Sequence, residues 1–175
     1  ALALAKEKKF KQSFIVFQNL IAFLETKDLI TIKNYVLISF SEALIKNNKQ
    51  KKAVLILEDL NNLYPTDNTI LHYLSRAYIA NKNYKKVLEK LLPYVVEHKD
   101  HKLILKISEA AYKLNETSLG HEYKGDYFKM LGSLNGAMKF YNLALRYNMK
   151  GRMIDERIKA KIKTIDVIKN SKEIL

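Results

Sequence analysis

The sequence predicts an all-α protein. Apolar residues recur at helical spacing along nearly the whole chain, for example at Leu37, Phe40 and Leu44. The 175 residues include only five glycines and two prolines, and Leu, Ile, Lys, Ala and Asn dominate the composition. Short polar stretches interrupt the apolar pattern at regular intervals. Together these observations favour helices of three to four turns that are joined by short connections.

The polar stretches divide the chain into about ten helices. Asp67 and Asn68 precede the apolar run that begins at Ile70, an arrangement typical of a helix start. Other stretches, such as KNNKQ (46–50) and ANKN (80–83), contain residues that are common in turns. We expect helices near 1–8, 10–24, 33–47, 50–63, 68–81, 84–97, 102–114, 117–131, 134–147 and 152–170.

The chain also contains an internal repeat. Aligning KNNKQKKAVLILEDL with ANKNYKKVLEKLLPY places Ala53 over Val87, a spacing of 34 residues. Large, small and large residues alternate along both helices of each unit, with Ser41 and Ser75 at small positions. This period and pattern resemble the tetratricopeptide repeat. We therefore predict one domain over 1–175, a TPR-like α-solenoid of antiparallel helix pairs. Its repeats lie near 1–26, 33–65, 68–99, 102–131 and 118–148, and a capping helix lies at 152–170.

Two places depart from this regular pattern. Ser13 matches the small position at Ala53 but lies 40 residues before it, so about six residues are inserted around ETKDLI. Pro93 falls inside a helical pattern, where it removes a backbone hydrogen bond. We expect a kink there, or an early end of the helix near Leu92.

Composition limits the possible functions. The net charge is +13, but it comes almost wholly from scattered lysines, and no basic platform with aromatic residues accompanies it. Nucleic-acid binding is therefore disfavoured. The absence of cysteine excludes disulfides and thiolate metal sites. The longest apolar run, FIVFQNLIAFL, is broken by Gln18 and Asn19 and is too short to span a membrane.

No known catalytic motif occurs, and we predict that this chain has no catalytic residues, metal site or cofactor of its own. The best metal candidate is His98, Asp100 and His101, but these residues lie in a predicted turn between lysines. The neighbouring pair His121 and Glu122 is not a stronger candidate. Paired carboxylates elsewhere are consecutive and point about 100° apart on a helix, so they do not converge.

A binding module would use the concave face formed by the first helix of each repeat. By repeat position, this face mixes apolar and charged side chains, which suits a peptide or protein segment. The Lys/Asn/Arg set with which some repeats bind a C-terminal carboxylate is absent, because Ile38 and Glu42 occupy two of its positions. The predicted binding residues are Tyr35, Ile38, Glu42, Thr69, His72, Arg76, Ile79, Leu103 and Lys106.

The C-terminal third carries a more specific resemblance. The run SLGHEYKGDYFKMLGSLNGAMKFYNLALRY, followed by RMIDERIKAKIKTI, resembles the C-terminal TPR domain of periplasmic HExxH zinc metallopeptidases related to the β-barrel assembly-enhancing protease. The opening ALALAKEKKF is similar to that family's first repeat and has no cap residue or signal peptide, so we expect a fragment of a longer protein. The residues that match are His121, Glu122, Tyr127, Phe128, Gly132, Ala137, Tyr141, Ala144, Leu145, Ile154, Asp155, Arg157 and Ile158.

The resemblance implies a non-catalytic interaction domain of an exported protease. Zinc and its ligands would then belong to a catalytic domain upstream, and the domain would engage substrates or the outer-membrane β-barrel assembly machinery in the periplasm. One alternative is a free-standing TPR adaptor, which would be cytoplasmic or in the envelope. A basic solenoid associated with nucleic acid is the third possibility.

Overall fold

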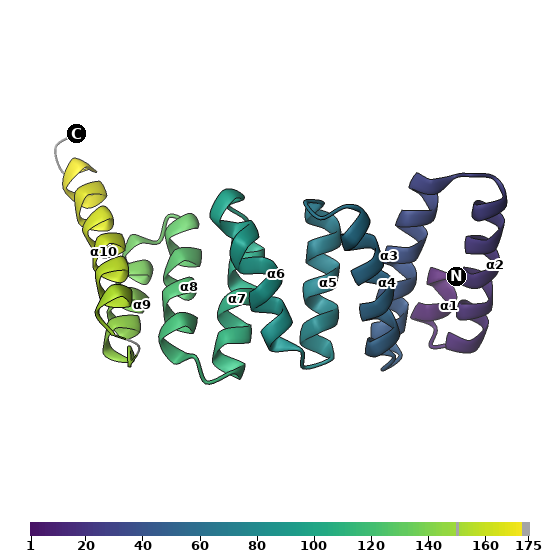
Figure 1. Cartoon of the computed structure of the whole chain (residues 1–175), viewed down its shortest axis with the longest axis horizontal. Helices are drawn as coiled ribbons and strands as arrows, with labels where there is room; N and C mark the ends of the chain where they lie inside the picture. Colours follow the sequence, from purple (N-terminus) through teal and green to yellow (C-terminus); the bar gives the residue numbers. More distant parts are fainter. Residues whose placement is uncertain (150, 173–175) are drawn as a thin grey trace. The chain divides into compact units, whose positions relative to one another are not determined.

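A computed structural model describes residues 1–149 and 151–172. These residues form ten α-helices and no strand, which confirms the prediction of an all-α chain (Figure 1). Most predicted boundaries are correct to within three residues. The helices are α1 (Leu2–Lys6), α2 (Phe10–Thr26), α3 (Ile30–Lys46), α4 (Gln50–Leu63), α5 (Asn68–Ala80), α6 (Tyr84–Glu97), α7 (His101–Lys113), α8 (Thr117–Met130), α9 (Leu134–Arg146) and α10 (Arg152–Lys172).

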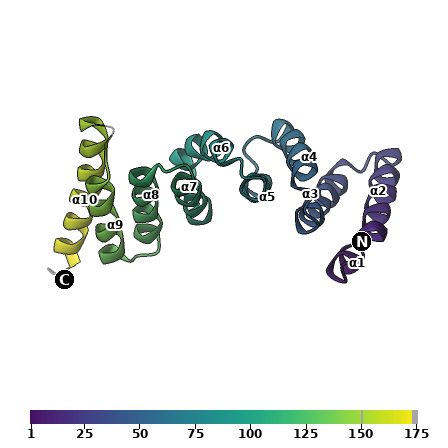
Figure 2. The same cartoon turned by 90° about the horizontal axis from the view of Figure 1, so that it is seen from below.

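The chain divides into two compact units. Unit 1 comprises Ala1–Asn83 with α1 to α5, and unit 2 comprises Tyr84–Leu175 with α6 to α10. Within each unit, helices that follow one another in the chain pack together. Figure 2 shows this arrangement clearly for α8, α9 and α10, where the chain reverses direction at each short connection. No helix among the described residues is both long and apolar enough to cross a membrane.

Most connections use one tight turn. A residue with positive φ follows the helix, and the next N–H donates to a carbonyl in the last turn of that helix. In the α3–α4 connection, for example, Asn48 has φ of 56° and the Lys49 N–H lies 2.8 Å from the Leu44 carbonyl oxygen. The residues with positive φ in these turns are Lys8, Asp28, Asn48, Lys82, Asn115 and Gly132.

Two further helices, α5 and α7, begin at an aspartate cap. Asp67 accepts a hydrogen bond from the Ile70 N–H at 3.0 Å, as its position in the sequence predicts. Asp100 accepts from the N–H groups of Lys102 and Leu103 at 2.8 and 3.0 Å. These caps fix where α5 and α7 begin.

Small buried serines allow close helix packing, as the repeat pattern predicts. Ser41 and Ser75 are almost fully buried, and each hydroxyl donates to a carbonyl in its own helix. Ser13 and Ser108 are equally buried, and they donate to the carbonyls of other segments, Ala1 and Gly120. A larger side chain at these positions would separate the helices.

Each unit has its own apolar core. In unit 1, the rings of Phe14 and Phe17 pack against Phe40, with ring centroids 5.5 and 5.1 Å away. In unit 2, Tyr141 of α9 and Ile158 of α10 are fully buried in one cluster. The C-terminal helix is therefore packed through its apolar face rather than being wholly polar.

One of the two alternatives expected at Pro93, an early end of the helix near Leu92, is wrong. α6 does not end at Leu92 but continues through Pro93 to Glu97. The structure shows where the extra residues near ETKDLI lie. α2 and α3 have 17 residues each, whereas α4 to α9 have 13 or 14, so the insertion lengthens two helices by about one turn.

Candidate functional site

Two glycines in α8 bring tyrosines close to its backbone. A Cβ at Gly120 would lie 2.6 Å from the ring of Tyr112, which comes from α7. A Cβ at Gly125 would overlap the ring of Tyr141, which comes from α9. Only a residue without a side chain fits at either position.

Both tyrosine hydroxyls bind the residue that follows the glycine. The Tyr112 hydroxyl lies 2.8 Å from Nδ1 of His121, and the Tyr141 hydroxyl donates to Oδ1 of Asp126 at 2.6 Å. Burial, together with the Asp126 charge, raises the pKa of Tyr141 well above its ordinary value. Burial lowers the pKa of His121. Tyr141 is therefore a permanent donor that fixes the Asp126 carboxylate.

An acidic pair on α8 meets a basic pair on α10. Glu122 is 1% exposed and accepts two hydrogen bonds from Arg157, at 2.9 Å from Nε and 2.6 Å from a terminal nitrogen. Lys161 Nζ lies 2.8 Å from Glu122 Oε1 and 2.6 Å from Asp126 Oδ2. Both pairs have one-turn spacing on their helices, so they select a single register of α10 against α8.

The buried carboxylate depends on these partners. An ionised group out of water is strongly disfavoured unless its charge is compensated and its oxygens accept hydrogen bonds. The planar guanidinium of Arg157 supplies both in a two-bond geometry. The hydrogen bonds to Glu122 raise the pKa of Arg157, which keeps the guanidinium charged.

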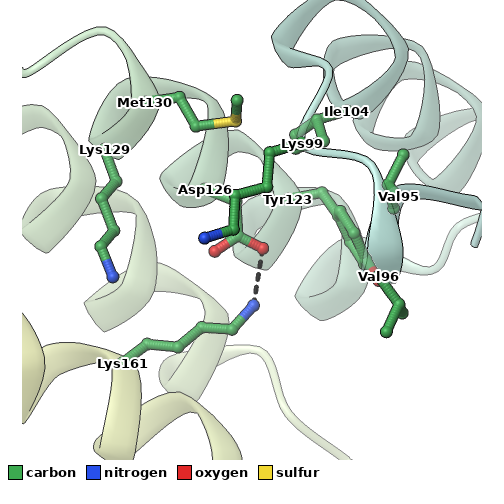
Figure 3. A pocket seen from close by; sticks show the side chains of 9 residues that line it. All are labelled: Val95, Val96, Lys99, Ile104, Tyr123, Asp126, Lys129, Met130 and Lys161. Atoms are coloured by element: carbon green, nitrogen blue, oxygen red, sulfur yellow. Dashed lines mark hydrogen bonds and ion pairs between the residues drawn. The ribbon is translucent and has the colours of Figure 1, made fainter.

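A pocket of about 390 Å³ lies beside this ionic cluster, entirely within unit 2 (Figure 3). We call it the lysine-rimmed pocket. It is formed by the end of α6, the α6–α7 connection, α7, α8 and α10. Its lining residues are Val95, Val96, Lys99, Ile104, Tyr123, Asp126, Lys129, Met130 and Lys161.

One part of the pocket is apolar. Val95 and Ile104 are buried and belong to the packed core of the unit. Val96 and Met130 are 76% and 38% exposed, so they present apolar surface to solvent. Exposed aliphatic groups beside a concavity are typical of places where another molecule binds.

The other part of the pocket is strongly basic. Lys99, Lys129 and Lys161 approach the space around Asp126 from three different segments (Figure 3). Among the described residues, Lys99 and Lys129 make no ion pair, whereas Lys161 is held by Glu122 and Asp126. Burial and the two nearby carboxylates raise the pKa of Tyr123 to about 12, so its hydroxyl is a donor at neutral pH.

Within unit 1, the structure brings some of the predicted binding residues together. Tyr35, Ile38 and Thr69 line a small pocket of about 190 Å³ in unit 1. Glu42 forms an ion pair with Arg76 at 3.6 Å, and that guanidinium also lies 5.5 Å from the Tyr73 ring.

The other predicted residues have mixed positions. His72 and Ile79 are half-buried on α5 and Lys106 is half-buried on α7, in unit 2. The prediction that Leu103 lines a binding surface is wrong, because its side chain is fully buried in unit 2. Ile38 is also largely buried, at 7% exposed, because its position on α3 faces the packed side of the helix.

The histidine motifs have structural partners. Asp100 caps α7, and the His98 ring stacks on Tyr94 with centroids 4.3 Å apart. His121 packs against Tyr112, and its neighbour Glu122 is the buried carboxylate described above. No group of three acidic or histidine side chains that could hold a metal ion occurs in residues 1–149 and 151–172.

Sequence reasoning missed the lysine-rimmed pocket. A signal was nevertheless present, because Glu122 and Asp126 repeat the spacing of Arg157 and Lys161 with opposite charge. The pairs Glu122–Arg157 and Asp126–Lys161 each join residues 35 positions apart, close to one repeat period. Comparison with known protein families and with curated protein sequences finds no match for this chain.

Proposed function

We propose that this chain is a protein-interaction domain that binds a segment of another protein in the lysine-rimmed pocket. The observation that carries the proposal is the pocket itself, which combines exposed aliphatic side chains with two lysines that form no ion pair in the described part of the chain. Its volume of about 390 Å³ is sufficient for one or two large side chains. A pocket of this kind anchors a segment, and surrounding contacts add specificity.

The packing beneath the pocket supports a binding role. Asp126 is fixed by both Tyr141 and Lys161, and Glu122 is fixed by Arg157. These bonds hold α8 and α10 in one arrangement, so little side-chain freedom is lost there on binding. Preorganisation of this kind increases affinity because it reduces the entropic cost of association.

We further propose, from the sequence resemblance of 118–165, that the domain belongs to an exported zinc metallopeptidase. It would then engage substrates or the outer-membrane β-barrel assembly machinery in the periplasm and influence access to the protease site. Reading the gene upstream of Ala1 tests this narrower proposal. An HExxH helix and a signal peptide are expected, and a start codon directly before Ala1 would instead favour a free-standing adaptor.

A peptide selection tests the binding function directly. The immobilised full chain is panned against an unrestricted displayed library of random peptides, and enriched peptides are synthesised and measured by fluorescence anisotropy. Val96→Asp places a charge on the exposed apolar wall, and we expect it to weaken binding by about tenfold or more.

Leu55→Asp is the matched control. Leu55 is 62% exposed on α4 in unit 1, so the same substitution is made at a similarly exposed apolar position outside the pocket. We expect unchanged affinity. Failure to enrich any peptide, or equal binding by the Val96→Asp variant, would contradict the proposal.

A further inference from the structure

We infer that the segment bound in the lysine-rimmed pocket carries a carboxylate next to a large apolar side chain. This inference rests on the proposed function and specifies its ligand. The carboxylate would contact Lys99 and Lys129, and the apolar side chain would lie against Val96 and Met130.

The charges of the pocket identify an anionic ligand. Three lysines and one carboxylate line it, so the lining has an excess of positive charge. The Asp126 carboxylate is already occupied, because Oδ1 accepts from Tyr141 and Oδ2 is bound by Lys161. Its single negative charge is paired with Lys161, so the charges of the other two lysines are not balanced within the pocket lining.

Lys99 and Lys129 differ from Lys161 in their role. Lys161 bridges two carboxylates at 2.8 and 2.6 Å, so it is a positioning residue rather than a ligand contact. Lys99 directly precedes the capping residue Asp100, which fixes the backbone from which its side chain extends. Lys129 lies in the last turn of α8 and is half-buried. The two ammonium groups thus come from separate segments, the α6–α7 connection and α8, and a carboxylate has two oxygens with which to accept from both.

The apolar wall makes a simple inorganic anion a poor match. Val95 and Ile104 form its buried part, and Val96 and Met130 form its exposed part. A bound aliphatic or aromatic side chain would exclude water from these groups and from the adjacent ion pairs. Charge-assisted hydrogen bonds are stronger where water is excluded. The two parts of the pocket therefore favour a ligand that is both apolar and acidic.

Four labelled peptides test this chemistry. All share a Gly/Ser background and differ only in the test residues and in the C-terminal group. The first contains an internal Leu-Glu-Phe with an amidated C-terminus, and the second replaces its Glu by Gln. The third ends in Leu-Phe with a free carboxylate, and the fourth is the same peptide amidated. Anisotropy titrations with the full chain give each affinity, and the two acidic peptides distinguish a side-chain from a C-terminal carboxylate.

We expect at least one carboxylate peptide to bind about tenfold more tightly than its neutral counterpart. Lys99→Glu and Lys129→Glu should each abolish this preference, whereas Lys139→Glu, an exposed lysine on α9, should preserve it. Circular dichroism checks that the variants remain helical. The preference should also decrease as salt is added, because ion pairs near a surface are screened.

Several results would overturn the inference. Equal binding of acidic and neutral peptides would reject the carboxylate and leave peptide binding intact. No binding by any of the four would reject this ligand class, and the unrestricted selection described above decides separately whether the pocket binds peptides at all. Sodium decanoate binding more tightly than every peptide would show that the pocket takes a fatty-acid anion instead.

Discussion

Tyr78 in unit 1 and Tyr141 in unit 2 are both almost fully buried, and each donates a hydrogen bond to a carboxylate on the preceding helix. Tyr78 binds Glu58 at 2.8 Å, and Tyr141 binds Asp126 at 2.6 Å. In unit 2 this bond is part of a larger network that includes the buried Glu122 and reaches α10. The units differ in a buried charge: among the described residues, Glu122 of unit 2 is buried, and no charged residue of unit 1 is buried to the same degree.

This difference in burial indicates where charged groups contribute most to stability. In unit 1, the ion pair between Lys33 and Glu25 joins α2 and α3 at the surface, where water screens it. In unit 2, the acidic residue Glu122 is buried, and loss of a partner would leave its charge poorly compensated out of water. We therefore expect substitutions of charged residues to affect unit 2 more strongly than unit 1.

Arg157→Met should have the largest effect. It leaves the Glu122 carboxylate buried with only Lys161 beside it, and we expect unit 2 to lose about 3 kcal/mol of unfolding free energy. Lys33→Met removes an exposed ion pair and should cost less than about 1 kcal/mol. Hydrogen exchange, resolved for α8 and α10 and for α2 and α3, measures both. A loss below about 1 kcal/mol for Arg157→Met would show that Lys161 alone is sufficient to compensate the buried Glu122 charge.

Gly125→Ala should have the next largest effect. The new Cβ would overlap the Tyr141 ring, and displacement of that ring would break its bond to Asp126. We expect a loss of about 2 kcal/mol in α8 and α9, measured by the same exchange experiment.

Gly132→Asn is the control for this prediction. Gly132 has φ of 77°, and nothing lies within 4 Å of an added Cβ there. Asn48 and Asn115 already adopt positive φ in equivalent turns, so asparagine should fit with a change below about 1 kcal/mol. Equal losses at the two positions would contradict close packing of Tyr141 as the cause.

The smallest effect is a pH dependence in unit 2. The pKa of Tyr123 is about 12 in the folded chain and 10.0 in its ordinary state. The unfolded chain therefore releases the Tyr123 proton at lower pH than the folded chain does. The contribution of Tyr123 to the free energy of unfolding is thus complete below pH 10 and is lost as the pH rises toward 12. Urea unfolding at about pH 9 and about pH 11 measures the decrease.

Tyr123→Phe should make this decrease smaller. Tyr35→Phe, at an exposed position in unit 1, is the matched control and should leave the decrease unchanged. An identical decrease in the wild type and the Tyr123→Phe variant would assign the alkaline destabilisation to other groups.

The helices were predictable because their signals are local. Apolar periodicity, the aspartate caps and the polar turns each involve residues within one or two helical turns. Pro93 is the exception, because a single proline removes one hydrogen bond while the packing of Val87, Leu91 and Val95 still favours a continuous α6.

The candidate site was much less predictable. A repeat position indicates which helix a residue occupies, but small rotations decide whether it faces solvent, as Leu103 and Ile38 show. The pairing of Glu122 with Arg157 joins residues 35 positions apart and has no local signal. Lys99 and Lys129 are two among many lysines in the sequence, and only their placement beside Val96 and Met130 distinguishes them.

Short connections also have a kinetic consequence. Within each unit, helices pack against helices that are adjacent or next but one in the chain. Native contacts therefore form between nearby segments, and little chain entropy is lost before they do. Each unit can begin to fold from any neighbouring helix pair without waiting for distant segments to meet. Folding on the microsecond-to-millisecond scale typical of helical proteins is expected.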